Sequence, residues 1–394
     1  MKKKIYLSAP ALVCCAGLNG DELYDSCITG NQSGLVKREH GGKSYPVGQI
    51  KGELPELPAD IREQPDYIDN TRIIRIINAA LCQLESAVEK AISKYGRDKI
   101  GVCLGSCDNG SEASFMAHND LFKNGAFPKE YNLRYQSASL PAEFVARKFN
   151  LGGPVLTVAT ACASGASAVM RGAELIRSGY CSAVIAGGAD IVSETVFTGF
   201  NALEAVSDSL TNPFSKNRKG INLGEGAAFF LLDTEAISGI ELLGSGESSD
   251  AYHMTAPGTD GAGPANAMKA ALLEAGIDSS KVGYVNLHGT GTDLNDKAES
   301  NALKAVFNKQ VPVSSTKPIT GHTLGAAGAI ETAICWLTIN GKKGLPVHCW
   351  DGVADEEAPF LPAGPQYESP SICMTNSFAF GGCNVSLILG RSND

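Results

Sequence analysis

Short β-branched runs alternate with small-residue segments of helical period along this chain, and the alternation limits the folds open to it. The run 155–159 is apolar and rich in β-branched residues. The segment after Cys162 carries apolar residues at helical spacing, at Ala163, Ala166, Val169, Met170, Ala173 and Ile176. Strands that alternate with helices pack in layers and form an α/β protein. The sequence therefore predicts an α/β fold.

Further elements continue this alternation in both halves of the chain. We predict strands over residues 5–7, 100–104, 155–159, 183–187, 227–232, 284–287, 311–315 and 385–389. We predict helices over residues 71–94, 142–149, 163–177, 264–275, 298–307 and 326–339. The proline-containing stretch 53–69 is expected to be a surface excursion. Each half contains a strand, a turn with a reactive residue and an Ala-rich helix, which suggests two similar halves, 1–235 and 236–394.

Cys162 stands at the turn between the run 155–159 and the helix that follows it. A thiol at a strand-to-helix turn faces the unpaired N–H groups and the positive end of the helix, and both favour the thiolate. We therefore expect a lowered pKa for this thiol and a nucleophilic sulfur. A buried structural role explains most of the 12 cysteines. Cys162 differs from them because catalytic partners occur elsewhere in the sequence.

Two histidines occupy turns of the same kind. His288 follows a predicted strand and opens a Gly/Thr-rich turn that contains Thr290 and Thr292, whereas His322 lies between a predicted strand and a helix. The ends of strands are where α/β sheets place their chemistry. Glycines there allow the backbone to approach a substrate closely, and threonine hydroxyls can bind it. A structural role explains either histidine alone, but the two together with Cys162 predict a catalytic centre.

Composition and charge exclude several classes of function. The chain has 394 residues, of which 43% are hydrophobic and 19% charged, as in ordinary globular proteins. Its formal net charge of −9 argues against general nucleic-acid binding, although Arg147–Lys148 and Arg218–Lys219 leave a local basic patch for an acidic partner open. The cysteines show neither C-x-x-C pairs nor zinc-type spacing, so we expect no metal site and no disulfide framework. Free thiols in this number indicate a reducing compartment, the cytoplasm.

The N-terminal segment allows two interpretations. Lys2–Lys4 followed by the apolar run 5–16 is similar to a secretory signal. The same residues also fit a first strand at 5–7 followed by a turn. Ser8 and Pro10 interrupt the apolar run, so we favour the strand. No stretch reaches the roughly 18 apolar residues that a membrane span needs. We predict no membrane span.

Segments spread over almost the whole chain resemble, in the same order, those of the β-ketoacyl-acyl carrier protein synthases of the elongating type, which are condensing enzymes of the thiolase superfamily. These segments are 31–34, 160–165, 222–227, 288–292, 317–328 and 376–384. The resemblance implies a five-layer αβαβα thiolase-like fold and an acyl carrier protein as partner. It also implies a homodimer, or a heterodimer with a chain-length-factor-like subunit. No metal or organic cofactor is implied, because the phosphopantetheine arrives on the carrier protein.

The resemblance also implies a role for each residue of the predicted centre. Cys162 would accept an acyl chain as a thioester. His288 and His322 would stabilise the enolate formed when a malonyl group loses CO₂, and two histidines in these places imply the elongating, decarboxylating branch. Lys317 would hold positive charge nearby and orient His322, while the N–H groups of Cys162 and Phe380 would form the oxyanion hole. Acidic residues that match supporting positions of the family are Asp296, Glu299 and Glu331.

Departures from the family pattern concern the substrate. The substrate contacts implied by the resemblance are Thr290, Thr292, Phe200, Asp108 and Gly381. Asp108 stands where an apolar residue commonly closes the acyl pocket, and a carboxylate there suits a polar or hydroxyaryl chain end. Alternatively, the segment 107–110 is simply a turn, for which Asp-Asn-Gly is well suited. Other departures occur at Ser167, Glu204, Ala379 and Cys383. Together these departures add aryl polyene or type II polyketide synthesis as an alternative to fatty-acid elongation.

Two other functions compete with this hypothesis. A non-catalytic chain-length-factor-like subunit would keep the fold and lack the nucleophile, whereas Cys162, His288, Lys317 and His322 are all present here. A CoA-dependent thiolase-type acyltransferase would need no carrier protein, and the pair of histidines argues against it. The sequence does not decide the chain length, the head group or the carrier protein.

Overall fold

The computed structural model describes residues 3–57, 59, 71–108, 110–129, 131–341, 343–355, 358 and 361–392. Most of the expected surface excursion 53–69, and Asn109 in the turn after Asp108, lie outside the described residues. The predicted strand at 5–7 is present as a strand over Tyr6–Leu7, which supports the interpretation of the N-terminal letters as a strand.

Eleven strands of the described chain form one mixed sheet. Its order is β11-β10-β12-β13-β9-β1-β8-β7-β5-β6, with β2 paired to β8. The strand bounds are β1 Tyr6–Leu7, β2 Ala11–Cys14, β5 Ile100–Gly105, β6 Val155–Val158, β7 Ala183–Asp190, β8 Gly226–Asp233, β9 Ile240–Ser249, β10 Tyr284–Asn286, β11 Val313–Ser314, β12 Ile372–Phe378 and β13 Cys383–Arg391. β5, β6 and β7 are parallel, as are β10, β11 and β12. β1 pairs with both β8 and β9, so it joins the strands of the two halves.

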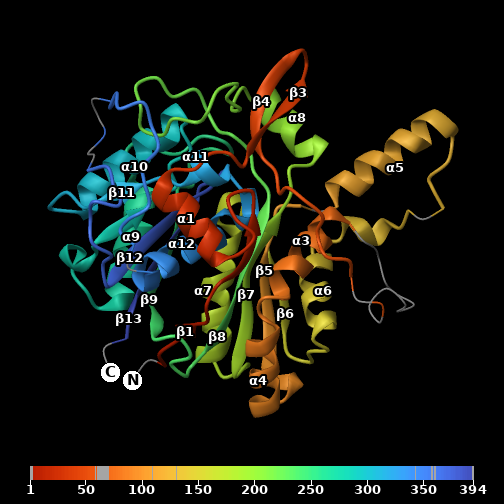
Figure 1. The fold of residues 1–394 in the computed structure, drawn as a ribbon, viewed down its shortest axis with the longest axis horizontal. Helices are drawn as coiled ribbons and strands as arrows, with labels where there is room; N and C mark the ends of the chain where they lie inside the picture. The colour runs from red at the N-terminus through yellow and green to blue at the C-terminus, as the bar shows by residue number, and fades with distance from the viewer. Residues whose placement is uncertain are drawn as a thin grey trace.

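Helices cover both faces of each half of the sheet. Their bounds are α1 Gly20–Thr29, α3 Arg72–Leu81, α4 Glu85–Tyr95, α5 Ser111–Asn124, α6 Leu140–Lys148, α7 Ser164–Arg177, α8 Glu194–Ala202, α9 Ala262–Ala275, α10 Asp293–Val306, α11 Lys317–Thr320 and α12 Ala327–Gly341. One hydrophobic core joins α3, α4 and α6 to β5, β7 and β8, a second joins α7 and α12 to the strands on either side, and a third joins α9 and α10 to β10 and β12. Figure 1 shows α3 and α6 on one flank and α9 and α10 on the other. The layers are therefore α, β, α, β, α, which is the predicted five-layer fold.

The two central helices approach each other closely because both contain glycine at the contact. A Cβ atom on Gly165 of α7 would lie 2.8 Å from the main-chain nitrogen of Ala329, and one on Gly328 of α12 would lie 2.7 Å from the Cβ of Ala166. α12 is buried along residues 327–339, as expected for a helix that is apolar on all sides. This crossing brings the N-terminal ends of α7 and α12 together at the middle of the molecule.

Several sequence predictions of secondary structure were wrong or incomplete. The single helix predicted over 71–94 is two helices, α3 and α4, because the chain turns at Gln83, whose side chain donates to the carbonyl oxygen of Leu12 and accepts from its N–H. α10 begins at Asp293, five residues before the predicted start at 298. The elements that the periodicity missed are α1, α5, α8, α11, β2, β9, β12 and the hairpin of β3 (Leu35–His40) and β4 (Lys43–Gly48). The division at residue 235 stays a prediction.

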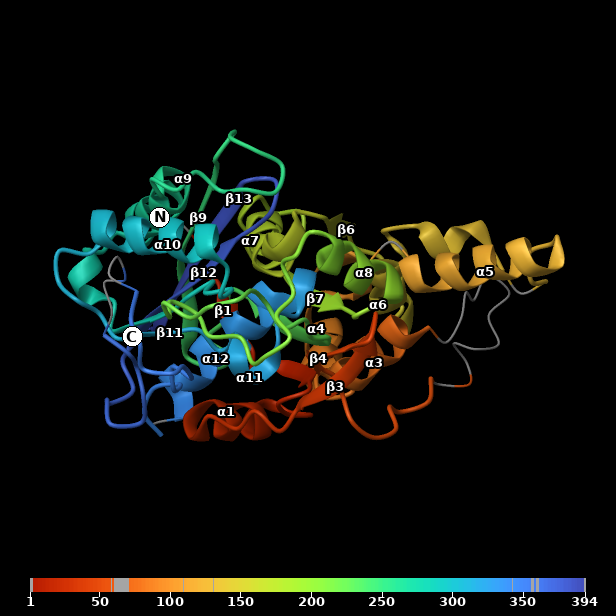
Figure 2. The ribbon, with the colours of Figure 1, turned by 90° about the horizontal axis from the view of Figure 1, so that it is seen from above.

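α5 stands out from the body of the molecule. Figure 2 shows it extending away from the sheets, beyond α6 and α8. It presents Phe115, Met116 and Phe122 to solvent, and Phe122 is 88% exposed. β6, at the neighbouring edge of the sheet, also exposes apolar side chains. No helix of the described residues is both long and apolar enough to cross a membrane.

Candidate active site

Cys162, His288 and His322 come together at the middle of the molecule, as the sequence predicts. The Cys162 sulfur and one ring nitrogen of each histidine all lie within 4.8 Å of one another, and all three residues are buried. The two imidazole rings meet edge to face, with centroids 5.5 Å apart and planes at 87°. Three segments far apart in the chain therefore build one centre.

A strained turn presents the thiol. Cys162 lies in a short 3-10 turn, η3 (Ala161–Ala163), between β6 and α7. Ala161 has φ 49°, in the left-handed region that non-glycine residues rarely adopt. The Ser164 hydroxyl stabilises the turn, since it accepts the N–H of Thr160 at 2.9 Å and donates to the carbonyl oxygen of Ala161 at 2.6 Å. The strain is held at the residue that precedes the nucleophile, where it sets the direction of the thiol.

The predicted pKa of the nucleophile was wrong in direction. Burial raises the pKa of the Cys162 thiol to about 11, and the positive charge of Lys317 and a hydrogen bond from the N–H of Phe380 offset only part of that rise. Removing a thiolate from water is the largest of these effects. The resting group is therefore a thiol, and the reaction must account for its proton.

Hydrogen bonds decide which nitrogen of each histidine carries the proton. Nδ1 of His322 accepts the N–H of Leu324 at 3.2 Å, so the proton is on Nε2. Nδ1 of His288 faces the ammonium group of Lys317 at 3.5 Å, which places its proton on Nε2 as well. Burial, followed by the charge of Lys317, holds the pKa of both histidines well below the usual range. Both rings are therefore neutral hydrogen-bond donors through Nε2.

Lys317 orients His288 and not His322, which corrects the prediction. Its ammonium group donates to the carbonyl oxygen of His288, lies near Nδ1 of the same residue and forms a buried ion pair with Glu331. Burial raises the pKa of Glu331 to about 7, against the opposing effect of Lys317. His322 takes its orientation from the main chain of Leu324 instead. The two histidines are thus fixed by different means.

The expected acidic residues hold the loop that contains His288. Glu299 accepts the N–H groups of His288 and Gly289 at 2.9 and 2.8 Å. Asp296 accepts those of Gly291 and Phe214 at 3.1 and 2.7 Å. Burial raises the pKa of both carboxyl groups to about 7. They position the main chain of the loop and do not reach the thiol themselves.

Asp190 was missed by the sequence reasoning. Its Oδ2 accepts two N–H groups from distant segments, that of Cys107 at 3.0 Å and that of Gly325 at 2.6 Å. Burial, followed by the charge of Asp108, raises the pKa of Asp190 to about 7. It ties the end of β5 to the turn η5 (Leu324–Ala326), whose first residue fixes His322. The available signal was a carboxylate at the end of an otherwise apolar strand, β7.

The donor set of Cys162, His288 and His322 matches the ligand types of zinc, but its hydrogen bonding opposes metal binding. A metal ligand needs a ring nitrogen with a free lone pair, and both Nε2 atoms carry protons because donors occupy both Nδ1 positions. The ammonium group of Lys317 adds a positive charge beside the centre. The arrangement suits hydrogen-bond donation to an anion.

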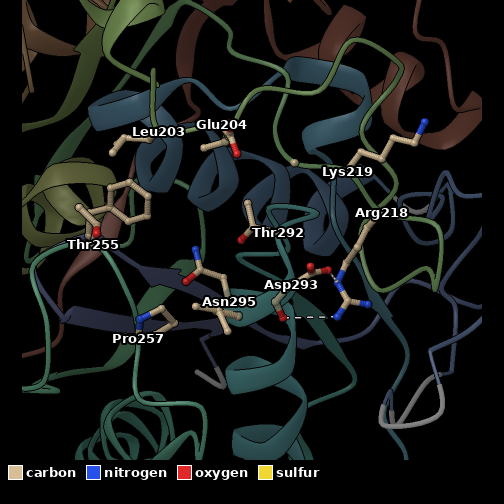
Figure 3. A pocket seen from close by; sticks show the side chains of 13 residues that line it. Leu203, Glu204, Arg218, Lys219, Thr255, Pro257, Thr292, Asp293 and Asn295 are labelled. Carbon is tan, nitrogen blue, oxygen red and sulfur yellow. Dashed lines mark hydrogen bonds and ion pairs between the residues drawn. The ribbon is translucent and has the colours of Figure 1, made fainter. Parts of the chain in front are cut away.

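An open cavity of about 450 Å³ leads from the surface toward this centre. Its wall includes the predicted residues Thr292 and Phe380, and Figure 3 shows Thr292 near its middle. The hydroxyl of Thr292 lies 2.9 Å from that of Thr290. Phe380 stacks on Phe200 with centroids 5.8 Å apart, and its N–H reaches the Cys162 sulfur. Phe380 therefore stands between the cavity, which we call the entrance, and the nucleophile.

The loop after Phe380 is fastened to a neighbouring loop. Gly381 has φ 87° and donates its N–H to the carbonyl oxygen of Met254 at 2.8 Å. Ala379 donates its N–H to the carbonyl oxygen of Cys383 at 2.8 Å. Glu204, which departs from the family pattern, lines the entrance with φ 54°. The predicted residues Thr290, Thr292, Phe200 and Gly381 thus lie at or next to the entrance.

Asp108 lies elsewhere, and its hydrogen bonds agree with the turn interpretation, whereas its role in an acyl pocket stays a prediction. Its Oδ1 accepts the N–H and the hydroxyl of Ser111 at 3.1 and 2.6 Å, which stabilises the start of α5 as the turn interpretation predicts. It also lines a second cavity of about 420 Å³, whose walls include Ile73, Met116, Tyr135 and Leu140. Most of the exposed wall is apolar, but the charged residues Arg72 and Glu112 also line the cavity. Asp108 therefore holds the first residue of α5, Ser111, and also lines the second cavity.

Comparisons with known proteins agree with this geometry. Residues 58–236 match the family model of the β-ketoacyl synthase N-terminal domain, and residues 240–348 match that of the β-ketoacyl synthase C-terminal domain. The chain belongs to the β-ketoacyl synthase family. It is 32% identical to the 3-oxoacyl-[acyl-carrier-protein] synthase 2 of Vibrio cholerae, over 99% of both chains. The predicted family, fold class and reaction class are confirmed.

Solved structures of ketosynthases resemble the chain over its full length. One is the complex of the ketosynthase ApeO with its chain length factor ApeC from Xenorhabdus doucetiae, with a TM-score of 0.91, 37% identity and coverage of 99% of this chain and 98% of that chain. Another is a β-ketoacyl synthase from Burkholderia phymatum, with a TM-score of 0.85, 28% identity and full coverage of both chains. The ishigamide ketosynthase/chain length factor has a TM-score of 0.86 and 26% identity, also with full coverage of both chains.

Proposed function

We propose that this β-ketoacyl synthase performs decarboxylative condensation at the centre formed by Cys162, His288 and His322. The observation that carries the proposal is the placement of one buried thiol opposite two neutral imidazoles that both present Nε2–H. A nucleophile is needed for acyl transfer, and two uncharged donors suit an enolate oxygen. This assignment also argues against a non-catalytic partner subunit, because the chain keeps the complete set of reactive groups.

In the first half-reaction an acyl chain moves from the thiol of a carrier protein to Cys162. The new thioester forms at the Cys162 sulfur, the carrier thioester breaks, and the proton that Cys162 loses balances the proton that the carrier thiol gains. The N–H groups of Cys162 and Phe380 receive the negative oxygen of the tetrahedral intermediate. The N–H of Phe380 supports this role, since it already reaches the sulfur.

In the second half-reaction a malonyl group on a carrier protein loses CO₂. The electron pair of the broken C–C bond forms an enolate, whose oxygen accepts hydrogen bonds from Nε2–H of His288 and of His322. The enolate carbon attacks the thioester at Cys162, and the released thiolate regains a proton from water. Lys317 keeps Nδ1 of His288 occupied and so holds the donor on Nε2. The phosphopantetheine arm enters with the carrier protein past Thr290 and Thr292.

The second cavity supports a proposal for the growing chain. It is mostly apolar, as an acyl chain requires, and Asp108 contributes a carboxylate to its wall. A chain end that donates a hydrogen bond, such as a hydroxyaryl group, would match this carboxylate. We therefore place the enzyme in aryl polyene or polyketide synthesis in preference to primary fatty-acid elongation.

Assembly with a second chain of the same fold is part of the proposal. β6 is at the edge of the sheet and exposes Val155 and Leu156, while α5 exposes Phe115, Met116 and Phe122. Met116 also lines the second cavity, so a subunit seated on α5 would close it. ApeO and the ishigamide ketosynthase are both described with chain length factors, which favours a heterodimer.

A reducing compartment, the cytoplasm, fits the cysteines of this chain. All twelve lie among the described residues, and none of them forms a disulfide. A nucleophilic thiol beside so many other free thiols needs protection from oxidation.

The test is intact-mass spectrometry of the purified protein offered carrier proteins with saturated or hydroxyaryl-polyenoyl chains, followed by malonyl-carrier protein. Loading on wild type and its loss in Cys162→Ala, with two-carbon extension after malonyl addition, is expected. Preference for the aryl chain supports the specialised pathway, and equal use of saturated chains contradicts it. Product formation by Cys162→Ala would overturn the catalytic assignment.

A further inference from the structure

A third cavity, of about 470 Å³, lies beside the second one. The two cavities share the wall residues Arg72, Glu112 and Ile191, so they meet at these side chains. The rest of the third cavity is lined mainly by the β3–β4 hairpin and the start of α8, which Figure 1 shows next to each other. Lys37 and Gln49 of its outer wall are exposed. The second cavity therefore borders a compartment that is open to water.

Two ion pairs engage most of the charges that line the third cavity. Arg72 donates to both carboxylate oxygens of Glu225, and Arg38 pairs with Glu194. Glu112 takes part in neither pair. Its Oε2 accepts the N–H of Glu194 at 3.0 Å, and no donor of the described residues is bonded to its Oε1. Glu112 therefore presents an unused acceptor at the boundary between the two cavities.

Hydrogen bonds hold this boundary in place. Ser111 donates its hydroxyl to Asp108 on the wall of the second cavity, and its oxygen lies 2.9 Å from the hydroxyl of Ser193 on the wall of the third. Ser193 in turn caps α8, because it accepts the N–H of Val196 at 3.2 Å. Glu112 adds a second link, to the main chain at the start of α8. Its carboxylate is thus held before any ligand arrives, which lowers the cost of binding one.

An acceptor in this place suits the far end of a long chain. A purely apolar chain end that reached the boundary would take water from its charged groups and return no hydrogen bond, which is costly. A hydroxyl at the chain end instead donates to Glu112 and stays close to solvent. Cavities of about 300–1,000 Å³ are typical of sites for drug-sized ligands, so the two cavities together can hold a longer chain than either one alone.

We propose that Glu112 and the third cavity form a subsite for the hydroxyaryl end of long intermediates, beyond the position of Asp108. Short intermediates end in the second cavity, next to Asp108. Longer ones cross the boundary and donate their hydroxyl to Oε1 of Glu112. The inference rests on the proposed function, because it takes the substrate to be a hydroxyaryl chain held on Cys162. It adds that the two carboxylates act at different chain lengths.

The test measures the loading of Cys162 from carrier-bound aryl chains that carry or lack the terminal hydroxyl. Aryl-propenoyl chains form the short pair of donors, and aryl-polyenoyl chains with several more double bonds form the long pair. The quantity measured for each pair is the hydroxyl preference, which is the kcat/KM with the hydroxyl divided by the kcat/KM without it.

Glu112→Gln is the decisive variant. Its amide oxygen can keep the bond to the N–H of Glu194, so the fold is retained, while its NH₂ group turns a donor toward the cavity in place of an acceptor. The hydroxyl preference of the long pair is expected to fall about tenfold, the order of one hydrogen bond to a charged group. That of the short pair should stay within about twofold of wild type, since short chains end before Glu112.

Two further variants show whether the effect belongs to Glu112. Asp108→Asn can still accept both hydrogen bonds from Ser111, and it should lower the hydroxyl preference of the short pair and leave that of the long pair. Glu89→Gln removes an exposed carboxylate of α4 that lines neither cavity, and it should change neither preference.

Three results would overturn the proposal: an unchanged preference of the long pair in Glu112→Gln, an equal fall for both pairs in that variant, or a fall for the long pair in Asp108→Asn alone. In the last case the chain end would stay in the second cavity. Wild type that shows no hydroxyl preference at either length would count against the aryl substrate of the proposed function instead.

Discussion

Two turns of the molecule have the same local conformation and different chemistry. η3 precedes α7 and η5 precedes α12, and the residues with positive φ are Ala161 at 49° and Leu324 at 54°. In η3 the next residue is the nucleophile Cys162. In η5 the corresponding residue is Gly325, whose N–H is donated to Asp190, while Leu324 orients His322. One turn therefore presents a reacting side chain, and the other uses its main chain to position one.

The difference shows how two turns of the same conformation can serve different steps of one reaction. In both places the strained turn directs main-chain groups at the start of a buried helix. The closeness of α7 and α12 at Gly165 and Gly328 puts the two turns side by side. Loading should then depend mainly on η3, and decarboxylative extension mainly on η5. Three perturbations separate these roles.

The largest effect is expected from Asp190→Ala, which removes the tie between β5 and η5. The buried N–H groups of Cys107 and Gly325 lose their acceptor, and an unpaired buried donor costs about 1–3 kcal/mol, so we expect a loss of about 2–4 kcal/mol in the unfolding free energy. Because η5 orients His322, extension with malonyl-carrier protein should slow about tenfold, more than loading does.

Asp190→Asn is the matched variant for this prediction. Its amide oxygen can take the place of Oδ2 and accept both N–H groups, so stability and extension should stay close to those of wild type. Urea unfolding and single-turnover mass spectrometry measure the two quantities. An equal loss of loading and extension in Asp190→Ala would mean that η5 has no separate role.

An intermediate effect is expected from single substitutions within the two turns. In Gly325→Ala the new Cβ would lie 2.6 Å from Oδ2 of Asp190 and 2.8 Å from the main-chain nitrogen of Cys107. Such overpacking against backbone should cost about 1–3 kcal/mol. Ala161→Gly instead relieves a left-handed φ but loosens the unfolded chain, so its effect should stay within about 1 kcal/mol. Thermal unfolding of both variants checks the contrast, which fails if Ala161→Gly is the more damaging.

The smallest effect, counted for one residue, is expected in the pH dependence of stability. Buried carboxyls on both sides of residue 235 contribute to it. Asp190 belongs to the first half, and Asp296, Glu299 and Glu331 belong to the second; burial raises the pKa of each to about 7. In the unfolded chain such groups lose their protons near pH 4, so the folded state binds more protons between about pH 4 and 7. Their stabilising contribution is therefore complete below about pH 4 and is lost as pH rises to about 7.

Urea unfolding at pH 6.5 and pH 8 measures this dependence, with a lower unfolding free energy expected at pH 8. Below this window the buried histidines, whose pKa values are lowered, change stability in the opposite direction. Asp190→Asn removes the contribution of the first half and should flatten the change by about 1 kcal/mol, the order of one pKa unit. Most of the slope should remain, because three of the four carboxyls lie in the second half. A stability that rises from pH 6.5 to pH 8 would contradict the assignment.

Much of the fold followed from local pattern. Continuous apolar runs predicted β5, β7 and β8, and helical spacing predicted α7, α9 and α12, because burial on several sides leaves a strong periodic signal in each segment. The helices α5 and α8 carry weaker patterns and were missed. The break between α3 and α4 was missed for another reason: it depends on Gln83 reaching the main chain of Leu12, a contact between residues distant in sequence.

In the candidate site, too, some features followed from local sequence and others depended on contacts between distant segments. Residue types and their spacing identified Cys162, His288 and His322, because nucleophiles, donors and glycine-rich turns can be recognised within single segments. The family resemblance added Lys317 and Phe380. Three features could be seen only in the tertiary structure. They are the direction of the Cys162 pKa shift, the pairing of Lys317 with His288, and the hydrogen bonds by which Asp190 connects two segments. Each depends on burial or on a neighbour from another segment. Local sequence carries the identity of a reactive group, whereas its charge, its tautomer and its orientation are set by the solvent it loses and the distant groups that replace that solvent.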